Sequence, residues 1–380
     1  MQERNRANVL AAARAEFVER GFRDAKVDVI ASRAGLTRGA VYSNFPGKRA
    51  LYFAVLAADA AVRERRTGSA RTPGEALAAL ARSWLGDLPL ATDVGPSRLA
   101  AELLPVVLAD ERTRRPFAQL TGLTALLVGL ALERPPPQRT FRPRMVRVAE
   151  AALTVLHGAG QLAAAAPGFV DEMVVVDACA QLADADFADR WAPPHLPYVA
   201  PARPVDLPFH LSGDALVAGG TAESGPRTTP AATTPDPARP PTAGRSVLGR
   251  AATGGMLGPL AADGVLVVLC LHRLTALEEA VRAAPRGVPV IATVVTGEPA
   301  ELGPLARLVL ADTDRHLAAA FPPGARPAVR IVLDEAGGLA AAAGVTAVSD
   351  ATETAVRLRG GRIVARADGP GAPHAAASFP

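Results

Sequence analysis

The sequence of 380 residues contains very little cysteine and no cysteine motif. Its two cysteines, Cys179 and Cys270, lie far apart, and no CxxC pair occurs, which argues against a disulfide framework. No two histidines lie within ten positions of each other, so a zinc site of cysteine and histidine is not indicated either. We therefore expect no metal site, no cofactor and no catalytic residues.

Lysine is almost absent, because Lys26 and Lys48 are the only lysines among 41 basic residues. A chain so rich in arginine and alanine is typical of a GC-rich genome, which weakens any argument from arginine counts alone. The distribution of charge is more informative. Residues 1–66 carry 13 basic and 7 acidic residues, whereas the whole chain has a net charge of only +4. A basic N-terminal segment on a near-neutral body favours binding to a polyanion.

Long hydrophobic runs are also missing. The longest, such as Leu123–Leu132 and Val265–Leu271, are too short to span a bilayer. The first ten residues, MQERNRANVL, are charged and lack the apolar segment of a secretory signal. We expect a soluble, cytoplasmic protein with no membrane partner.

The length of 380 residues predicts two or three domains, and hydrophobic residues, 49% of the chain, are enough to form their cores. Residues 1–66 predict short helices, since Val9, Ala13 and Phe17 recur every four residues and Gly21 supplies a helix stop. Residues 67–192 continue as helices. The expected helices are centred on Leu77–Leu85, Leu99–Val107 with a break at Pro105, Phe117–Leu132, Val146–Gly160 and Val170–Trp191.

Residues 193–245 are crowded with proline, glycine, serine and threonine, which predicts a flexible linker. Residues 246–380 then show an α/β pattern. Two β-branched runs, Val265–Leu271 and Val288–Val295, flank the helical pattern Thr275–Ala284, so they predict a parallel βαβ unit. Further on, the patterns predict a strand at Ala328–Leu333, a short helix at Gly338–Ala343, and a hairpin of Thr354–Arg359 with Arg362–Ala367 across Gly360-Gly361.

The stretch AGLTRGAVYSNF, residues 34–45, carries the most specific signal. It contains the second of two short helices, Val27–Ala34 and Arg38–Phe45, whose connection is Gly35-Leu36-Thr37. Gly35 can adopt the positive φ of a tight turn, and Thr37 is a good N-cap. The expected wedge between the helices consists of Ile30, Ala31, Ala34, Leu36, Val41 and Phe45. An ordinary small helical bundle with a polar surface is the alternative to a helix-turn-helix motif.

The outward side of the second helix suits contact with DNA. Gly39 and Ala40 lack bulk, so the helix can approach a groove closely. The polar residues Thr37, Arg38, Tyr42, Ser43 and Asn44 point outward and can donate to phosphates or base edges. Lys48 begins the next helix, where its ammonium and the free N–H groups can hold one phosphate.

Residues 7–56 closely resemble the N-terminal DNA-binding domain of the TetR/AcrR family of bacterial transcriptional regulators, through the motif IASRAGLTRGAVYSNFPGKRALY. The resemblance implies that Arg38–Asn44 is the recognition helix in the major groove and that Thr37, Tyr42 and Lys48 contact the DNA backbone. It also implies a homodimer on a palindromic operator in double-stranded DNA. The sequence departs from the family at Ala25-Lys26, where members often carry threonine, and at Asn44, where they often carry histidine. The full predicted DNA-binding set is Lys26, Thr37, Arg38, Gly39, Ala40, Tyr42, Ser43, Asn44 and Lys48.

The same resemblance implies that residues 67–192 bind a small-molecule effector and dimerise. We expect the apolar stripe Val146, Ala149, Leu153, Leu156 and Gly160, together with the helix Val170–Trp191, to form a four-helix dimer interface, with burial inside one subunit as the alternative. An apolar effector is expected among the preceding helices. The candidate ligand-binding residues are Trp84, Phe117, Phe141 and His157, each of which can instead be a core residue.

Residues 246–380 resemble thioredoxin-like and peroxiredoxin-like domains through GVLVVLCLHRLTALEEAVRAA and the closing hairpin that ends GGRIVARADGP. The redox chemistry is not expected to carry over. The loop Leu271–Thr275 holds no cysteine at the helix start, and residues 346–354 hold no proline. Cys270 is expected to be a buried small hydrophobic residue, and His272 with Arg273 is a candidate for an anion or partner site.

The leading hypothesis is a homodimeric transcriptional repressor that a small-molecule effector releases from its operator, without catalysis. The predicted fold class is an all-α regulator of a three-helix DNA-binding domain (1–66) and a helical effector-binding and dimerisation domain (67–192), then a linker (193–245) and an α/β thioredoxin-like domain without redox cysteines (246–380). One alternative is a DNA-tethered thiol oxidoreductase or peroxidase. Another is a regulator whose C-terminal domain is a protein-interaction module.

Overall fold

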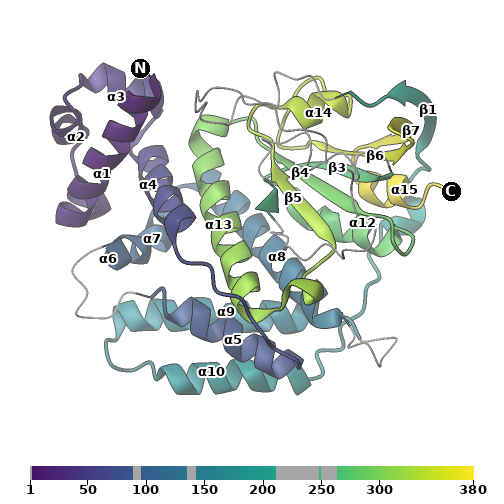
Figure 1. Ribbon diagram of the computed structural model, residues 1–380, viewed down its shortest axis with the longest axis horizontal. Helices are drawn as coiled ribbons and strands as arrows, with labels where there is room; N and C mark the ends of the chain where they lie inside the picture. Colours follow the sequence, from purple (N-terminus) through teal and green to yellow (C-terminus); the bar gives the residue numbers. More distant parts are fainter. Residues whose placement is uncertain (1, 89–95, 135–142, 211–247, 250–262) are drawn as a thin grey trace, which may run out of the picture.

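The computed structural model describes residues 2–88, 96–134, 143–210, 248–249 and 263–380. A helical half formed by the N-terminal residues lies beside a half built on one β-sheet (Figure 1). Candidate Phe141 and most of the expected linker lie outside the described residues.

The helical half confirms the expected order of helices. Its helices are α1 (Gln2–Asp24), α2 (Val27–Arg33), α3 (Arg38–Asn44), α4 (Lys48–Val62), α5 (Pro73–Leu85), α6 (Pro96–Ala101), α7 (Leu103–Leu108), α8 (Glu111–Glu133), α9 (Val146–Ala165) and α10 (Glu172–Gln181). The break near Pro105 falls instead at Glu102, because proline is tolerated in the first turn of α7. The last helix is shorter than expected, since after Gln181 only a 3₁₀ turn, Leu182–Asp184, continues it.

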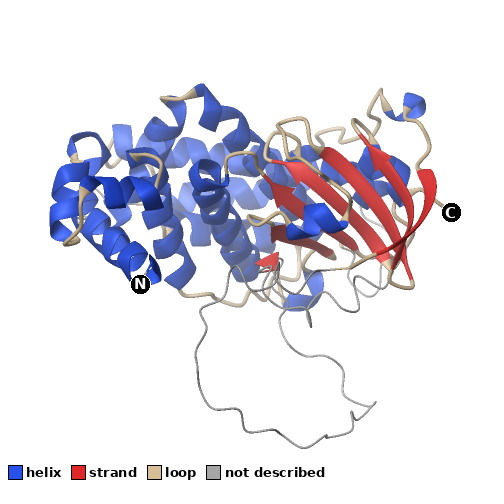
Figure 2. Cartoon of the chain, turned by 90° about the horizontal axis from the view of Figure 1, so that it is seen from above, coloured by secondary structure: helices blue, strands red, loops and turns tan. Residues whose placement is uncertain are grey.

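The C-terminal half is a mixed sheet with helices on its faces (Figure 2). Its strands are β1 (Arg203–Pro208), β2 (Leu248–Gly249), β3 (Gly264–Cys270), β4 (Val290–Val295), β5 (Val329–Leu333), β6 (Glu353–Arg359) and β7 (Arg362–Asp368), and its helices are α12 (Leu277–Ala283), α13 (Pro299–Ala320), α14 (Gly338–Ala342) and α15 (Ala372–Ala377). The strand order is β1-β7-β6-β3-β4-β5-β2. The β3–β4 pair is parallel and the β6–β7 pair is antiparallel, as predicted.

Two features of this half correct the sequence analysis. Residues 203–208, which we placed in the linker, form edge strand β1 antiparallel to β7. Pro204 and Pro208 are compatible with an edge strand, yet they give the segment the composition of a linker. The sequence analysis also did not identify α13, a helix of 22 residues that is the longest of the C-terminal half. Its interior Pro304 interrupts the helical pattern, although Pro299 marks a typical helix start.

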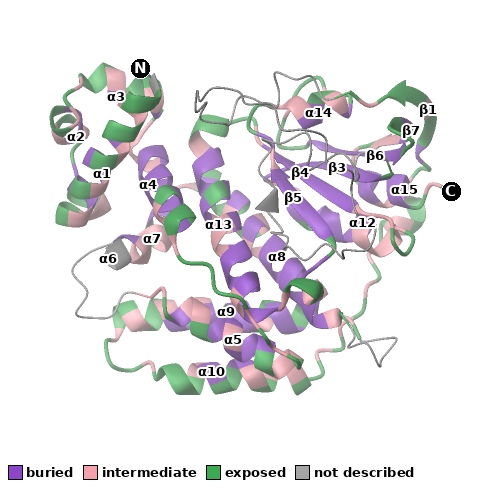
Figure 3. Ribbon diagram, viewed as in Figure 1, coloured by how far each residue is buried: buried purple, intermediate pink, exposed green. Residues whose placement is uncertain are grey.

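Helix α13 packs against the helical half rather than only against its own sheet (Figures 1 and 3). It lies along α4 and also contacts α5 and α8. Residues Ala50–Ala57 of α4 are all buried, which is the pattern of a helix covered on several sides. Leu305, Leu310 and Leu317 of α13 belong to the same continuous core as α4.

Helix α8 is the one described helix that is long and apolar enough to cross a membrane. Most of its apolar window, 61%, is buried inside the protein, as is common for the core helix of a globular fold.

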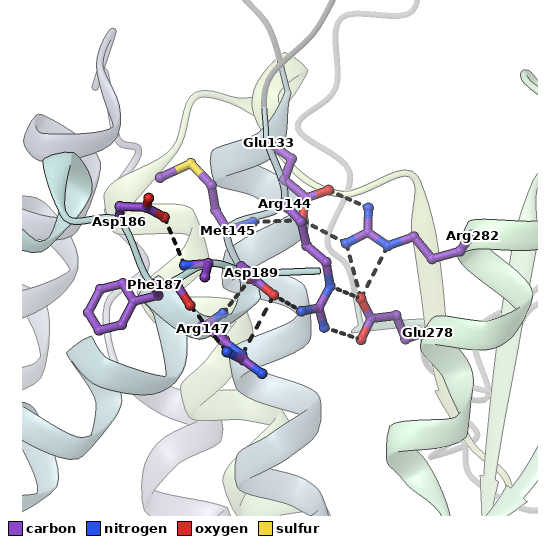
Figure 4. Close-up of polar contacts among 10 residues, drawn as sticks. Glu133, Arg144, Met145, Arg147, Asp186, Phe187, Asp189, Glu278 and Arg282 are labelled. Atoms are coloured by element: carbon purple, nitrogen blue, oxygen red, sulfur yellow. Dashed lines mark hydrogen bonds and ion pairs between the residues drawn. The ribbon is translucent and has the colours of Figure 1, made fainter. Parts of the chain in front are cut away.

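A cluster of ion pairs fixes α12 to the helical half (Figure 4). Arg144 pairs with Glu278 of α12 through two hydrogen bonds of 2.7 Å and also binds Asp189. Arg282 of α12 bridges Glu278 and Glu133, the last residue of α8. The side chain of Glu278 is only 8% exposed, so its carboxylate is compensated by the two guanidinium groups that face it.

We predict that Glu278→Ala lowers the free energy of unfolding by about 2 kcal/mol, because Arg144 and Arg282 each lose one of their two carboxylate partners. Arg112→Ala is the control, since that side chain is 72% exposed and its ion pair contributes less than about 1 kcal/mol. Urea unfolding followed by circular dichroism measures both. Equal losses in the two variants would contradict the role of this cluster.

Candidate functional site

The two short helices α2 and α3 form the expected helix-turn-helix. Gly35 has a φ of +66°, the left-handed conformation that a turn between two helices requires. Thr37 caps α3, since its hydroxyl accepts a 3.2 Å hydrogen bond from the Ala40 N–H. Ile30, Ala31, Val41 and Phe45 are buried, and Ala34 and Leu36 pack against them, so the predicted wedge is present.

The outward face of α3 is available to a partner. Thr37, Arg38, Gly39, Tyr42 and Ser43 are exposed, whereas Ala40 and Asn44 are half-buried. The Arg38 guanidinium lies 5.5 Å from the centre of the Tyr42 ring and 3.3 Å from the Asp28 carboxylate. Its hydrogen bond to the Tyr42 hydroxyl, with the nearby charge of Asp28, raises the pKa of Arg38, so this side chain stays cationic.

The two lysines of the chain lie at the edges of this face. Lys26 is exposed at the N-cap of α2, and its own N–H donates to Glu16 at 3.3 Å. The ammonium of Lys48 donates to the carbonyls of Arg23 and Ala25 at 3.0 and 3.1 Å. An ammonium has three donors, so one of them remains for a phosphate. All the predicted DNA-binding residues therefore lie at the N-cap of α2, at the N-cap or within α3, or at the first residue of α4.

The helix-turn-helix connects to the helical body at a break in α1. Gly21 has a non-helical φ of +74°, which confirms the predicted helix stop. The freed N–H of Phe22 donates to the carboxylate of Glu102, the residue between α6 and α7. A second link joins α4 to α6, because the Tyr52 hydroxyl donates to the Leu99 carbonyl. A displacement of α6 therefore changes its hydrogen-bonded contacts with both α1 and α4.

A cavity of about 150 Å³ lies between the helical body and α13, and Ala100 of α6 and Leu103 of α7 are in its lining. The structure brings together three of the four predicted ligand-binding residues in its lining, Trp84, Phe117 and His157. The helical body also contributes Leu88, Ala100, Leu103, Thr121, Thr124 and Leu153. The C-terminal half contributes Leu308, Val309, Asp312, Thr313 and His316, all on α13, which the sequence analysis did not associate with this site.

Aromatic rings form one end of the cavity. The His157 ring packs edge-on against Trp84 and Phe117, at centroid distances of 4.8 and 6.2 Å. His316 stacks on the ring of Trp84 at a centroid distance of 5.0 Å. Burial lowers the pKa of both His157 and His316, so both imidazoles are neutral at neutral pH.

Charged groups form the other end and are paired with one another. Arg63, at the C-cap of α4, lies 3.4 Å from Asp312 and 3.9 Å from Asp87. Arg315 binds the same two carboxylates. Burial raises the pKa of Asp312 against the opposing effect of both arginines.

The loop before α12 does not form the anion site considered from the sequence. His272 lies 3.2 Å from the Asp350 carboxylate, and Arg273 pairs with the buried Glu353. Cys270 is buried, as expected, and its thiol donates to the Asp350 carbonyl at 2.7 Å. Desolvation raises the pKa of Cys270, which disfavours a nucleophilic thiolate.

The comparisons with known proteins identify the N-terminal region. Residues 9–55 match the family profile described as bacterial regulatory proteins, tetR family. HTH-type transcriptional regulator SrpR of Pseudomonas putida is 49% identical over 55 residues, which are 14% of this chain and 26% of SrpR. The uncharacterized HTH-type transcriptional regulator TtgW, also of Pseudomonas putida, is 50% identical over 52 residues, 14% of this chain and 39% of TtgW. The matched part thus spans well under half the length of these relatives.

This chain carries the DNA-binding helix-turn-helix domain of the TetR family of transcriptional regulators. Among solved structures, a TetR transcriptional regulator from Rhodococcus sp. RHA1 is 18% identical, covers 48% of this chain and 94% of its own, and has a TM-score of 0.33. SmeT, the repressor of the Stenotrophomonas maltophilia multidrug efflux pump SmeDEF, is 24% identical, covers 47% and 85%, and has a TM-score of 0.30. With TM-scores this low, neither structure bears on the arrangement of the helical body.

The free energy of unfolding of the protein should depend on pH through His316, which lines the cavity. Its pKa in the folded protein lies well below the value of about 6.5 in the unfolded chain. As the pH falls through 6.5, the unfolded chain takes up the proton first, so the free energy of unfolding decreases. We predict that His316→Gln loses less stability than the wild type between about pH 7.5 and pH 5.5.

Thermal unfolding at the two pH values tests this expectation. The neighbours of His316 are Ser83, Trp84, Asp87 and Arg315. His210→Gln is the matched control, because His210 is exposed. A pH dependence of His316→Gln equal to that of the wild type would refute the assignment.

Proposed function

We propose that the whole protein is a homodimeric, DNA-binding transcriptional repressor that a small-molecule effector releases from its operator. The observation that carries the proposal is the exposed polar face of α3, placed on a helix-turn-helix whose sequence belongs to regulators. In this proposal α3 enters the major groove, where Arg38 and Asn44 meet base edges. Thr37, Tyr42 and Lys48 hold the DNA backbone, Lys26 and Ser43 lie beside them, and Gly39 and Ala40 allow close approach.

The dimer interface proposed here differs from the expected stripe. Val146, Ala149, Leu153 and Leu156 are all buried within the subunit, so they cannot meet a second copy. The opposite face of α9 is open, and a Cβ added at Gly158 would meet nothing within 4 Å. Next to it, four large apolar side chains are exposed, Leu162, Phe169, Met173 and Val174. An exposed apolar patch beside a helix position that carries no side chain suits close packing of two copies.

Effector release follows from the position of the cavity. Ala100 of α6 and Leu103 of α7 line it, and Glu102 between them holds the N–H of Phe22 in α1. The ion pair of Arg63 with Asp312 connects the charged end of the cavity to the C-terminal end of α4. A bound molecule that shifts these groups changes the tilt of α1 and α4, and with it the spacing of two recognition helices on successive major grooves.

The C-terminal half is proposed to be a thioredoxin-like domain without a redox site. Its support is the parallel β3-α12-β4 unit followed by the β6–β7 hairpin and a final helix. The positive φ values of Gly360 and Gly361 fit the tight hairpin turn. Because Cys270 is buried with a raised pKa, we favour a structural role in the regulator over an oxidoreductase.

The DNA proposal is tested by gel shift with the DNA upstream of the protein's own gene, against random DNA of equal length at physiological salt. We expect clearly tighter binding to the upstream DNA, and Arg38→Ala should reduce that preference about tenfold. Arg115→Ala, which removes an exposed charge from α8, is the control and should leave the preference unchanged. Equal affinity for both DNAs in the wild type would sink the proposal, since charge alone gives non-specific binding.

The dimer proposal is tested at Gly158. Gly158→Glu places a charge on the proposed interface without a clash inside the subunit, so we expect it to shift the protein from dimer to monomer. Gly158→Ala keeps the face small and should remain dimeric. Size-exclusion chromatography with light scattering distinguishes the two states. A wild type that is monomeric at micromolar concentration, or a dimeric Gly158→Glu variant, would overturn this interface.

A further inference from the structure

We propose that the cavity between the helical body and α13 is a binding site for an uncharged, single-ring aromatic compound with one hydroxyl group, that is, a phenol. Binding of this compound to the cavity does not depend on the proposed function. Only its role as the effector rests on that function. The site is composite, because the C-terminal half forms one of its walls.

The size of the cavity sets the size of the ligand. Its volume of about 150 Å³ equals that of an engineered apolar cavity that stays dry and holds benzene. Trp84, Phe117 and Leu153 provide flat and apolar walls on the side of the body, and Val309 of α13 closes the opposite side. A single aromatic ring therefore fits this space.

His157 provides the specificity for a hydroxyl group. A neutral imidazole has one donor and one acceptor, and among the residues that the structure describes no hydrogen-bond partner faces either ring nitrogen of His157. The hydroxyls of Thr121 and Thr124 also line the cavity. The Thr121 hydroxyl donates to the Phe117 carbonyl and keeps its lone pairs for a ligand, whereas the Thr124 hydroxyl also shares a 2.8 Å hydrogen bond with Thr313. A phenolic hydroxyl can donate to one of these groups and accept from another.

The charged end of the cavity argues against an ionised ligand. Arg63 and Arg315 face Asp87 and Asp312, so each cation already has a carboxylate partner. A carboxylate ligand would have to break one of these pairs or remain unpaired in a mostly apolar site, and either costs binding free energy. The cavity therefore favours phenol over benzoate.

Isothermal titration calorimetry on the full chain tests the ligand class with phenol, toluene and benzoate as probes. We expect phenol to bind about tenfold more tightly than toluene, the difference that one buried hydrogen bond makes. Benzoate should bind more weakly than phenol. No heat with phenol at millimolar concentration, or benzoate binding as tightly as phenol, would overturn the proposal.

Variants locate the site. Val309→Phe fills the cavity from α13 and should abolish phenol binding, whereas Arg307→Met, on the exposed side of the same helix, should leave it unchanged. His157→Leu should remove the preference for phenol over toluene while toluene still binds. If Val309→Phe does not fold, His157→Leu still decides: an unchanged preference would refute the role of His157 and with it the proposal.

The gel shift with upstream DNA separates this inference from the proposed function. Specific DNA binding without any phenol binding would support the proposed regulator and refute the phenol site. Phenol binding without specific DNA binding would support the phenol site and refute the proposed regulator.

Discussion

The packing of α4 between α1 and α13 is the contact on which the rest of the structure depends. On the side of α1, Phe17 and Phe22 enclose Tyr52 at centroid distances of 5.6 and 5.0 Å. On the side of α13, Arg49 near the start of α4 pairs with Glu301 near the start of α13. Arg63 at the C-cap of α4 pairs with Asp312 in the second half of α13. The two helices therefore run parallel, and the orientation of the DNA-binding helices is fixed by residues from both ends of the chain.

This arrangement connects the cavity by short paths to α1 and α4, the helices on either side of the helix-turn-helix. One path runs from Leu103 through Glu102 to the broken turn of α1 at Gly21, and the other runs from Arg63 into α4. A side chain at Gly21 would place its Cβ 2.6 Å from the Glu102 carboxylate, so glycine permits this close contact. Ligand binding can bias DNA binding only if it favours one of two arrangements of these groups.

The helix-turn-helix could be predicted from the sequence because each of its requirements is local. Gly35 needs only its own positive φ, and Thr37 caps a helix that begins at the next residue. The stripe on α9 shows the opposite case, since its period identifies an apolar face but not the helices α5 and α8 that cover it. In the cavity, Trp84 stood out as an unusual residue in its segment, whereas its partners on α13 lie more than 200 residues later. Contacts between helices so distant in sequence depend on tertiary packing, which no local pattern encodes.

The C-terminal half contributes packing surface to the helical half. Cys270 is buried, and the side chains of His272 and Arg273 that follow it are already paired with Asp350 and Glu353. In contrast, α12 carries Glu278 and Arg282 to the helical body, and α13 covers α4 and closes the cavity. Removing the half would expose consecutive buried residues of α4 and open one wall of the cavity. The α/β half is therefore a structural part of the DNA-binding half, since the helix that positions the recognition motif has no complete core without it.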